Sequence, residues 1–159
     1  MTRKWIGICV PVIATDQIIK AYIRQQTPGK TLFALPGLVA VTPSFNTGAA
    51  FSLLSGRPAL LAAVSAVLLI ALFLYVSRRM QLTGAAQTAL CLVIGGGVGN
   101  LIDRIVYAGV TDYIRLLLFD FPVFNLADMA ITGGVAALFV LLFAGRLEEA
   151  TGDKHGSDH

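Results

Sequence analysis

The chain has 159 residues, of which 56% are hydrophobic and only 13% are charged, and its mean hydropathy is +0.77. A soluble domain of this length needs more charged surface than that, so the composition excludes an ordinary soluble protein and indicates a membrane protein. The formal net charge of +3 comes without a basic stripe interleaved with aromatic residues. We therefore expect no nucleic-acid partner.

Four apolar stretches predict membrane-spanning helices, because about 20 apolar residues are needed to cross the hydrocarbon core. In chain order they are residues 5–23, 58–76, 85–102 and 123–144. We interpret the first as a retained helix and not as a cleaved signal, because its apolar pattern resumes after Ala14 and continues to Ile23. The expected fold class is an all-α, multi-pass membrane protein with one domain over residues 1–146.

The basic residues beside these stretches predict the orientation in the membrane. Arg3 and Lys4 precede the first stretch, Arg78 and Arg79 lie between the second and third, and Arg146 follows the fourth. Cytoplasmic flanks are enriched in Lys and Arg, so we expect both termini to lie in the cytoplasm. Residues 24–57 and 103–122 then lie on the outer, periplasmic side.

The two outer segments differ in composition. Pro28-Gly29 and Pro36-Gly37 signal turns in the first segment, and the residues between the turns favour a small β element on the membrane surface. The second segment is too apolar for a solvated loop and too charged to span, so we expect it to lie in the membrane interface. Residues 147–159 have the composition of a disordered cytoplasmic tail.

Polar residues gather at the outer ends of the predicted spans. They are Asp16 and Lys20 on the first span, Asn100, Asp103 and Arg104 on the third, and Asn125 and Asp128 at the beginning of the fourth. Asp16 and Lys20 are four residues apart and can pair on one helix face. Arg104 is expected to orient a carbonyl group or to pair with Asp103. Helix association explains Asp16, Asp103 and Arg104 as well as a functional site does.

Asp112 and Asp128 are the strongest candidates for catalysis. An acid at this depth is costly, and a packing role rarely needs two acids without matched cations. Two carboxylates within about 3 Å share one proton, so one can take a proton from water while the other donates to a carbonyl oxygen. The residues themselves do not indicate which aspartate is the initial base.

Other site chemistries find little support in the residues. Gly95, Gly96, Gly97 and Gly99 do not complete a nucleotide-binding G-x-G-x-x-G motif, and Gly95 and Gly99 are better explained by close helix packing. The histidines lie in the tail, the two cysteines lie within apolar stretches, and H-E-x-x-H is absent. We expect no metal and no cofactor. A serine-lysine dyad of Lys20 with Ser44 or Ser52 stays open on paper.

Five motifs follow one another along the chain. They are Asp16-Gln17-x-x-Lys20, Asn46-Thr47-Gly48-Ala49-Ala50-Phe51-Ser52, Gly99-Asn100-Leu101-Ile102-Asp103-Arg104, Val110-Thr111-Asp112 and Phe124-Asn125-Leu126-Ala127-Asp128. In this order among four spans, they closely resemble the bacterial lipoprotein signal peptidases, also called signal peptidase II. The resemblance covers about residues 5–144.

The resemblance implies an inner-membrane aspartic peptidase without a cofactor. Such an enzyme removes signal peptides from prolipoproteins by cutting before a diacylglyceryl-modified cysteine, and globomycin is expected to block it. It implies that Asp112 and Asp128 form the catalytic dyad. It further implies that the substrate pocket is lined by Asn46, Gly48, Asn100, Arg104 and Asn125, with Asp16, Lys20 and Asp103 supporting the site. We expect a monomer whose partners are modified prolipoproteins and membrane lipids.

Three residues depart from the family pattern. Thr111 and Tyr113 flank Asp112 where valine and phenylalanine are more common, and Met129 follows Asp128 where a small residue is more common. Residues 46–52 are a candidate lid over the site. The competing interpretation is a small transporter or membrane assembly factor in which the acids relay protons or bind a partner.

Overall fold

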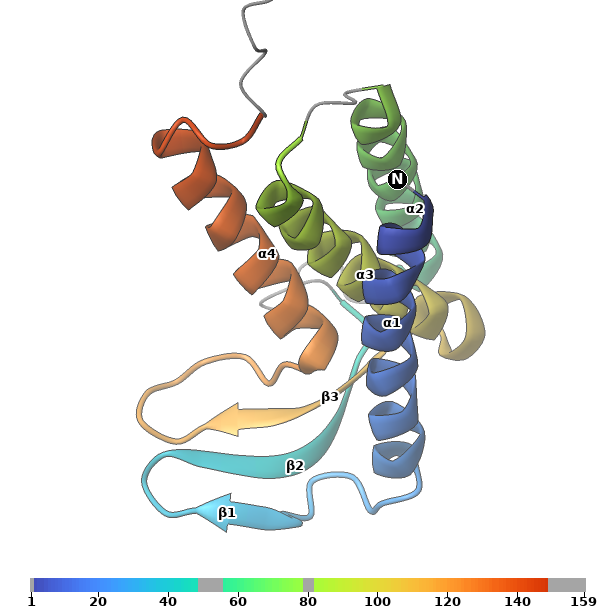
Figure 1. Cartoon of the computed structure of the whole chain (residues 1–159). Coiled ribbons are helices and arrows are strands. Elements are labelled where there is room, and N and C mark those ends of the chain that lie inside the picture. The colour runs from blue at the N-terminus through green and yellow to red at the C-terminus, as the bar shows by residue number, and fades with distance from the viewer. Residues whose placement is uncertain (1, 49–55, 79–81, 149–159) are drawn as a thin grey trace, which may run out of the picture.

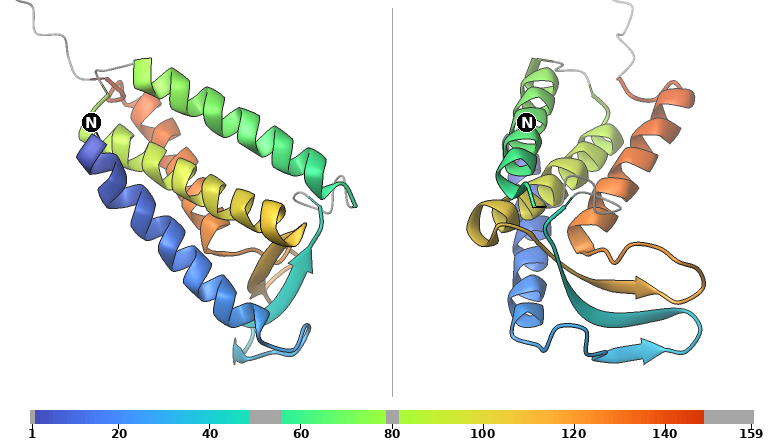
Figure 2. Two further views of the ribbon diagram at one scale, coloured as in Figure 1. Left: turned by 90° about the vertical axis from the view of Figure 1, so that its right-hand side faces the viewer. Right: turned by 180° about the vertical axis from the view of Figure 1, so that it is seen from behind.

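A computed structural model describes residues 2–48, 56–78 and 82–148. Within these ranges the elements follow in the order α1 (Thr2–Arg24), β1 (Phe33–Leu35), β2 (Val39–Asn46), α2 (Pro58–Arg78), α3 (Gly84–Tyr107), β3 (Val110–Leu116) and α4 (Leu126–Phe143). The helices form a bundle in which α1, α2 and α4 pack on α3, and a small sheet lies at one end of it (Figures 1 and 2). The fold is therefore mostly helical.

Three helices of the described chain, α2, α3 and α4, are long and apolar enough to cross a membrane. Large apolar side chains on α2 and α4 point outward, among them Val67, Leu68 and Val140, which are 65%, 64% and 68% exposed. Such surfaces are suited to lipid. The helix α1 has 23 residues, but Asp16, Gln17 and Lys20 interrupt its apolar run. The membrane span predicted for residues 5–23 therefore stays a prediction.

Glycines let the other helices approach α3 closely. A Cβ atom on Gly95 would lie 3.1 Å from Cβ of Val12 on α1, and one on Gly99 would lie 2.6 Å from Oδ2 of Asp16. A Cβ atom on Gly96 would collide with the backbone carbonyl of Ala127 on α4. The prediction that Gly95 and Gly99 serve helix packing is confirmed, and Gly96 does the same.

The sheet has the strand order β1-β2-β3, and both strand pairs are antiparallel. The first outer segment supplies β1 and β2, as predicted. The second segment was expected to lie in the membrane interface, and this location stays a prediction. In the structure α3 continues through its first residues to Tyr107, and β3 follows. β-Branched and aromatic residues favour extended structure there, and β2 provides the hydrogen-bonding partner. The register places Asp112 opposite Ser44, beside Asn46.

The beginning of α4 positions residues of the candidate site, and its end leads into the last residues that the structure describes. The helix begins at Leu126, three residues later than predicted, because Asn125 is its N-cap and Phe124 pairs with Ile114 of β3. Leu147 and Glu148, predicted to begin the tail, instead contact the segment before α3: the amide of Thr83 donates to the carbonyl of Leu147 at 3.0 Å. The rest of the predicted tail, residues 149–159, lies outside the described residues.

Candidate active site

Asp112 lies on β3 and is only 3% exposed. Its carboxylate accepts two hydrogen bonds from amide side chains: Nδ2 of Asn125 donates to Oδ1 at 2.7 Å, and Nδ2 of Asn46 donates to Oδ2 at 3.3 Å. Asn46 is held in this orientation because its Oδ1 accepts a hydrogen bond from the amide of Gly48 at 2.9 Å. The strand thus presents a buried, hydrogen-bonded acid.

Asp128 lies in the first turn of α4, where it is half-buried. Asn125 and Asp128 form a capping box: the amide of Asp128 donates to Oδ1 of Asn125 at 3.0 Å, and the amide of Asn125 donates to Oδ2 of Asp128 at 3.1 Å. Oδ1 of Asp128 accepts a hydrogen bond from Nδ2 of Asn100 at 2.7 Å. Helix capping and α3 together fix this second acid.

Asn125 connects the two carboxylates. Because its Oδ1 is used to cap α4, its Nδ2 group must face the other way, toward Asp112. Its side chain is fully buried, and its Nδ2 also lies 3.2 Å from Oδ1 of Asn100. One amide side chain therefore sets the relative positions of a strand acid and a helix acid.

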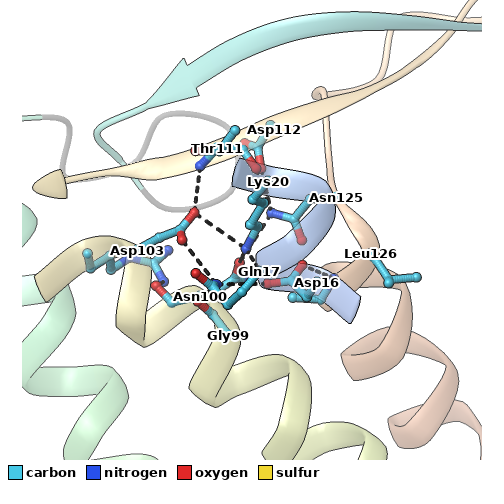
Figure 3. A network of polar contacts seen from close by, with 12 residues as sticks. Asp16, Gln17, Lys20, Gly99, Asn100, Asp103, Thr111, Asp112, Asn125 and Leu126 are labelled. Atoms are coloured by element: carbon cyan, nitrogen blue, oxygen red, sulfur yellow. Dashed lines mark hydrogen bonds and ion pairs between the residues drawn. The ribbon is translucent and has the colours of Figure 1, made fainter. Parts of the chain in front are cut away.

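A buried polar cluster lies beside Asp112 and Asn125 (Figure 3). Nζ of Lys20, with no exposed area, lies 2.8 Å from Oδ2 of Asp16 and 3.5 Å from Oδ2 of Asp103, and it donates to Oδ1 of Asn100 at 2.8 Å. The predicted pairing of Asp16 with Lys20 is confirmed. Gln17 joins the cluster by donating to Asp103 at 3.2 Å. Charges buried to this depth persist only when they are paired.

The cluster holds the backbone beside each catalytic candidate. Oδ1 of Asp16 accepts a hydrogen bond from the amide of Ala127 at 3.1 Å, next to Asp128. Oδ2 of Asp103 accepts one from the amide of Thr111 at 3.0 Å, next to Asp112. The charged cluster on α1 and α3 therefore fixes the two chain segments that carry the acids.

Three further residues make hydrogen bonds at the site, although the sequence did not indicate them as site residues: Arg24, Thr111 and Tyr113. Nη1 of Arg24 lies 3.3 Å from Oδ1 of Asp103 and 3.2 Å from Oγ1 of Thr111, so Asp103 pairs with Lys20 and Arg24 and not with Arg104. The hydroxyl of Tyr113 accepts a hydrogen bond from the amide of Leu126 at 3.2 Å. Arg24 lies four residues after Lys20, and this spacing was the available signal.

A cavity of about 540 Å³ opens beside the two acids. Of the residues predicted for the site, those that line it are Asn46, Asn100, Arg104, Asp112 and Asp128. Neither Gly48 nor Asn125 is among the described residues that line this cavity. Gly48 instead hydrogen-bonds Asn46, and Asn125 hydrogen-bonds Asp112. Apolar residues from the start of α4 and the chain before it complete the wall, among them Phe124, Met129 and Ile131.

The surroundings of Asp112 change its acidity. Burial, together with the negative charge of Asp128, raises the pKa of the Asp112 carboxyl to about 7. The hydrogen bonds from Asn125 and Asn46 lower this pKa, but burial outweighs them. Among the described residues, no three His, Cys, Asp or Glu side chains are grouped as a metal site. The site therefore offers a protonated acid close to a second carboxylate.

Comparison with known proteins gives the family. The sequence profile described as signal peptidase (SPase) II matches residues 8–144. The chain belongs to the signal peptidase II family. Its assignment as a peptidase of this family agrees with the resemblance carried by the five motifs.

Relatives in this family cover nearly the whole chain. The lipoprotein signal peptidase of Streptococcus pneumoniae is 37% identical over 92% of this chain and 94% of its own length. That of Brevibacillus brevis is 36% identical over 86% of this chain and 92% of its own length.

Solved structures of two bacterial membrane enzymes share the fold. One superposes with a TM-score of 0.83 at 30% identity, covering 98% of this chain and 94% of that one. The other has a TM-score of 0.79 at 33% identity, over 87% and 91% of the two chains. The fold is thus shared with solved bacterial membrane enzymes over nearly the whole chain.

Proposed function

We propose that the chain is an aspartic endopeptidase that removes signal peptides from prolipoproteins, cutting before a diacylglyceryl-modified cysteine. The observation that carries this proposal is the pair of carboxylates held on one cavity by a shared asparagine. Family membership supports the substrate class, because the relatives are lipoprotein signal peptidases.

In this proposal Asp112 begins as the acid and Asp128 as the base. Asp112 still carries a proton in a large fraction of molecules near neutral pH because its pKa is raised to about 7. Asp128 accepts hydrogen bonds from Nδ2 of Asn100 and from the amide of Asn125, which hold its carboxylate in place beside the cavity. Lys20 fixes the orientation of Asn100, since it binds Oδ1 of Asn100 and leaves Nδ2 to face Asp128.

The reaction then needs only water and the two acids. Asp128 takes a proton from a water molecule as the water oxygen bonds to the scissile carbonyl carbon, and Asp112 gives its proton to the carbonyl oxygen. In the second step Asp128 returns its proton to the leaving nitrogen as the carbon–nitrogen bond breaks, and Asp112 regains a proton from a hydroxyl of the intermediate. Both acids end as they began.

The cavity wall suits a lipid-linked substrate. Met129, Ile131 and Thr132 on α4 line one side, and α4 has an exposed apolar surface suited to lipid. Two acyl chains can remain among apolar groups while the peptide bond reaches the acids. Arg104 also lines the cavity, and its guanidinium is suited to bind a substrate carbonyl.

We further propose that α1 also crosses the membrane, so that the chain is a monomer with four spans in the bacterial inner membrane. Its polar residues Asp16 and Lys20 are fully buried, whereas Val10 and Ile18 are 53% and 70% exposed, so its outer surface is apolar. The beginning of α1 and the end of α4 lie away from the sheet (Figure 1). Both termini are then cytoplasmic, and the sheet and the dyad lie near the periplasmic face among membrane lipids.

Identifying the cut site tests the proposed function. The purified protein in detergent is given a diacylglyceryl-modified prolipoprotein and, in parallel, the same chain without the lipid. We expect a product that begins at the modified cysteine, no product from the unmodified chain, and inhibition by globomycin. Cleavage at another position, or equal cleavage of the unmodified chain, would contradict the proposal.

A further inference from the structure

A second cavity, of about 490 Å³, adjoins the dyad on the side of the sheet. Its wall is formed by Ser44, Phe45, Asn46, Asp112, Arg115, Asp120, Phe121, Pro122 and Val123. It shares Asn46, Asp112 and residues 121–123 with the first cavity. Asp112 therefore lies where the two cavities meet, and a substrate bound across it extends into both.

The two cavities differ in the residues that they do not share. The first is completed mainly by apolar groups, such as Leu116, Met129 and Ile131. The second is completed by Phe45 and by three polar residues, Ser44, Arg115 and Asp120, and the two charged side chains are exposed. Within the described chain, neither Arg115 nor Asp120 forms an ion pair. The second cavity thus offers one free cation and one free anion to a bound chain.

The edge of β3 beside the second cavity is already occupied. The amides of Tyr113 and Ile114 donate to the carbonyl of Phe124 at 3.0 and 2.8 Å, and the amide of Phe124 donates back to Ile114 at 3.0 Å. The amide of Thr111 is held by Asp103. At these amides a substrate therefore cannot add as a strand, which is the usual way that sheets bind peptides. Side chains must supply the recognition.

We propose that the second cavity binds the polar peptide chain that follows the scissile bond, and that Arg115 and Asp120 select it by charge. This proposal rests on the proposed function. The signal peptide and the acyl chains of the modified cysteine then lie in the apolar first cavity, and the first mature residues after that cysteine lie in the second. Arg115 favours acidic residues at these positions and Asp120 favours basic ones, because opposite charges attract at short range.

A charge exchange tests this assignment. Three diacylglyceryl-cysteine peptides are prepared that differ only in the residues after the cysteine, which are acidic, neutral or basic. kcat/KM is measured for each in neutral detergent with wild type, Arg115→Glu and Asp120→Lys. We expect Arg115→Glu to change the acidic-to-basic ratio about fivefold toward basic peptides, and Asp120→Lys to change it in the opposite direction.

Lys30→Glu is the matched control, because Lys30 is exposed and lines neither cavity. It should leave the ratio as in the wild type. If neither cavity variant changes the ratio, or both lower all three rates equally, the charge selection is wrong while the peptidase activity stands. A charge effect that appears only after phosphatidylglycerol is added would assign Arg115 to a lipid headgroup and overturn the proposal. If the wild type cuts none of the peptides, the proposed function itself fails.

Discussion

Of the two acids, Asp112 has the more unusual environment. Its carboxyl lies on a strand, is almost fully buried and faces a second carboxylate. Asn125 and Asn46 donate to both of its oxygens, yet its pKa is still raised to about 7. The free energy cost of ionising it in this setting is what keeps a proton available. Asn125 matters for the same reason, since it holds Asp112 and caps the helix that carries Asp128.

The pH dependence of cleavage follows from this acidity. If Asp112 must be protonated to donate to the carbonyl oxygen, activity is present below its pKa and is lost as the pH rises through about 7. We expect kcat/KM to fall about tenfold for each pH unit well above that value, because kcat/KM reports the pKa of the substrate-free enzyme. The check is kcat/KM measured at several pH values on both sides of neutral. An alkaline limb absent up to about pH 9 would contradict the assignment of Asp112 as the initial acid.

At the scale of elements, the site depends on how closely α4 approaches α3. Gly96 of α3 touches the backbone carbonyl of Ala127, one residue before Asp128, and Gly99 touches Asp16. The Asp16 carboxylate in turn binds the amide of Ala127. The first turn of α4 is therefore fixed by a glycine contact and by a buried acid from α1, and small changes there move Asp128, the proposed base.

Gly96→Ala tests this packing. The added methyl group has no space against a backbone carbonyl, so α4 must shift away from α3. We expect a loss of stability of about 1–3 kcal/mol, as for other overpacked sites, and a larger relative loss of cleavage. Thermal unfolding in detergent and the cleavage rate are compared with those of Gly7→Ala, a control in which the methyl group meets nothing within 4 Å. Equal behaviour of the two variants would show that the contact is not needed.

At the scale of the molecule, the sequence predicted the apolar helices and the acids but not the way they meet. Hydropathy located α2, α3 and α4, and the i, i+4 spacing of Asp16 and Lys20 predicted their ion pair. β3 was missed, because a strand is defined by its partner, and β2 lies more than 60 residues earlier. Local periodicity carries no information on such distant pairing.

The contacts that support the site could not be predicted from the sequence for the same reason. Pairing with Asp103 was one of two roles expected of Arg104, but Asp103 pairs with Lys20 and Arg24 from the other end of the chain. The contact of Asp16 with Ala127 spans 111 positions. Motif order identified which residues belong to the site, whereas only the fold shows that the charged cluster holds the backbone on which both acids depend.

The central claim is that two aspartates perform the cleavage, and the most direct measurement compares wild type with Asp112→Asn and Asp128→Asn. Each purified variant is given a diacylglyceryl-modified prolipoprotein in detergent containing a chelator, and its thermal unfolding is recorded to confirm folding. We predict that both folded variants lose cleavage by about 10³-fold or more, while the wild type keeps its activity. Near-full activity in either folded variant would contradict the dyad.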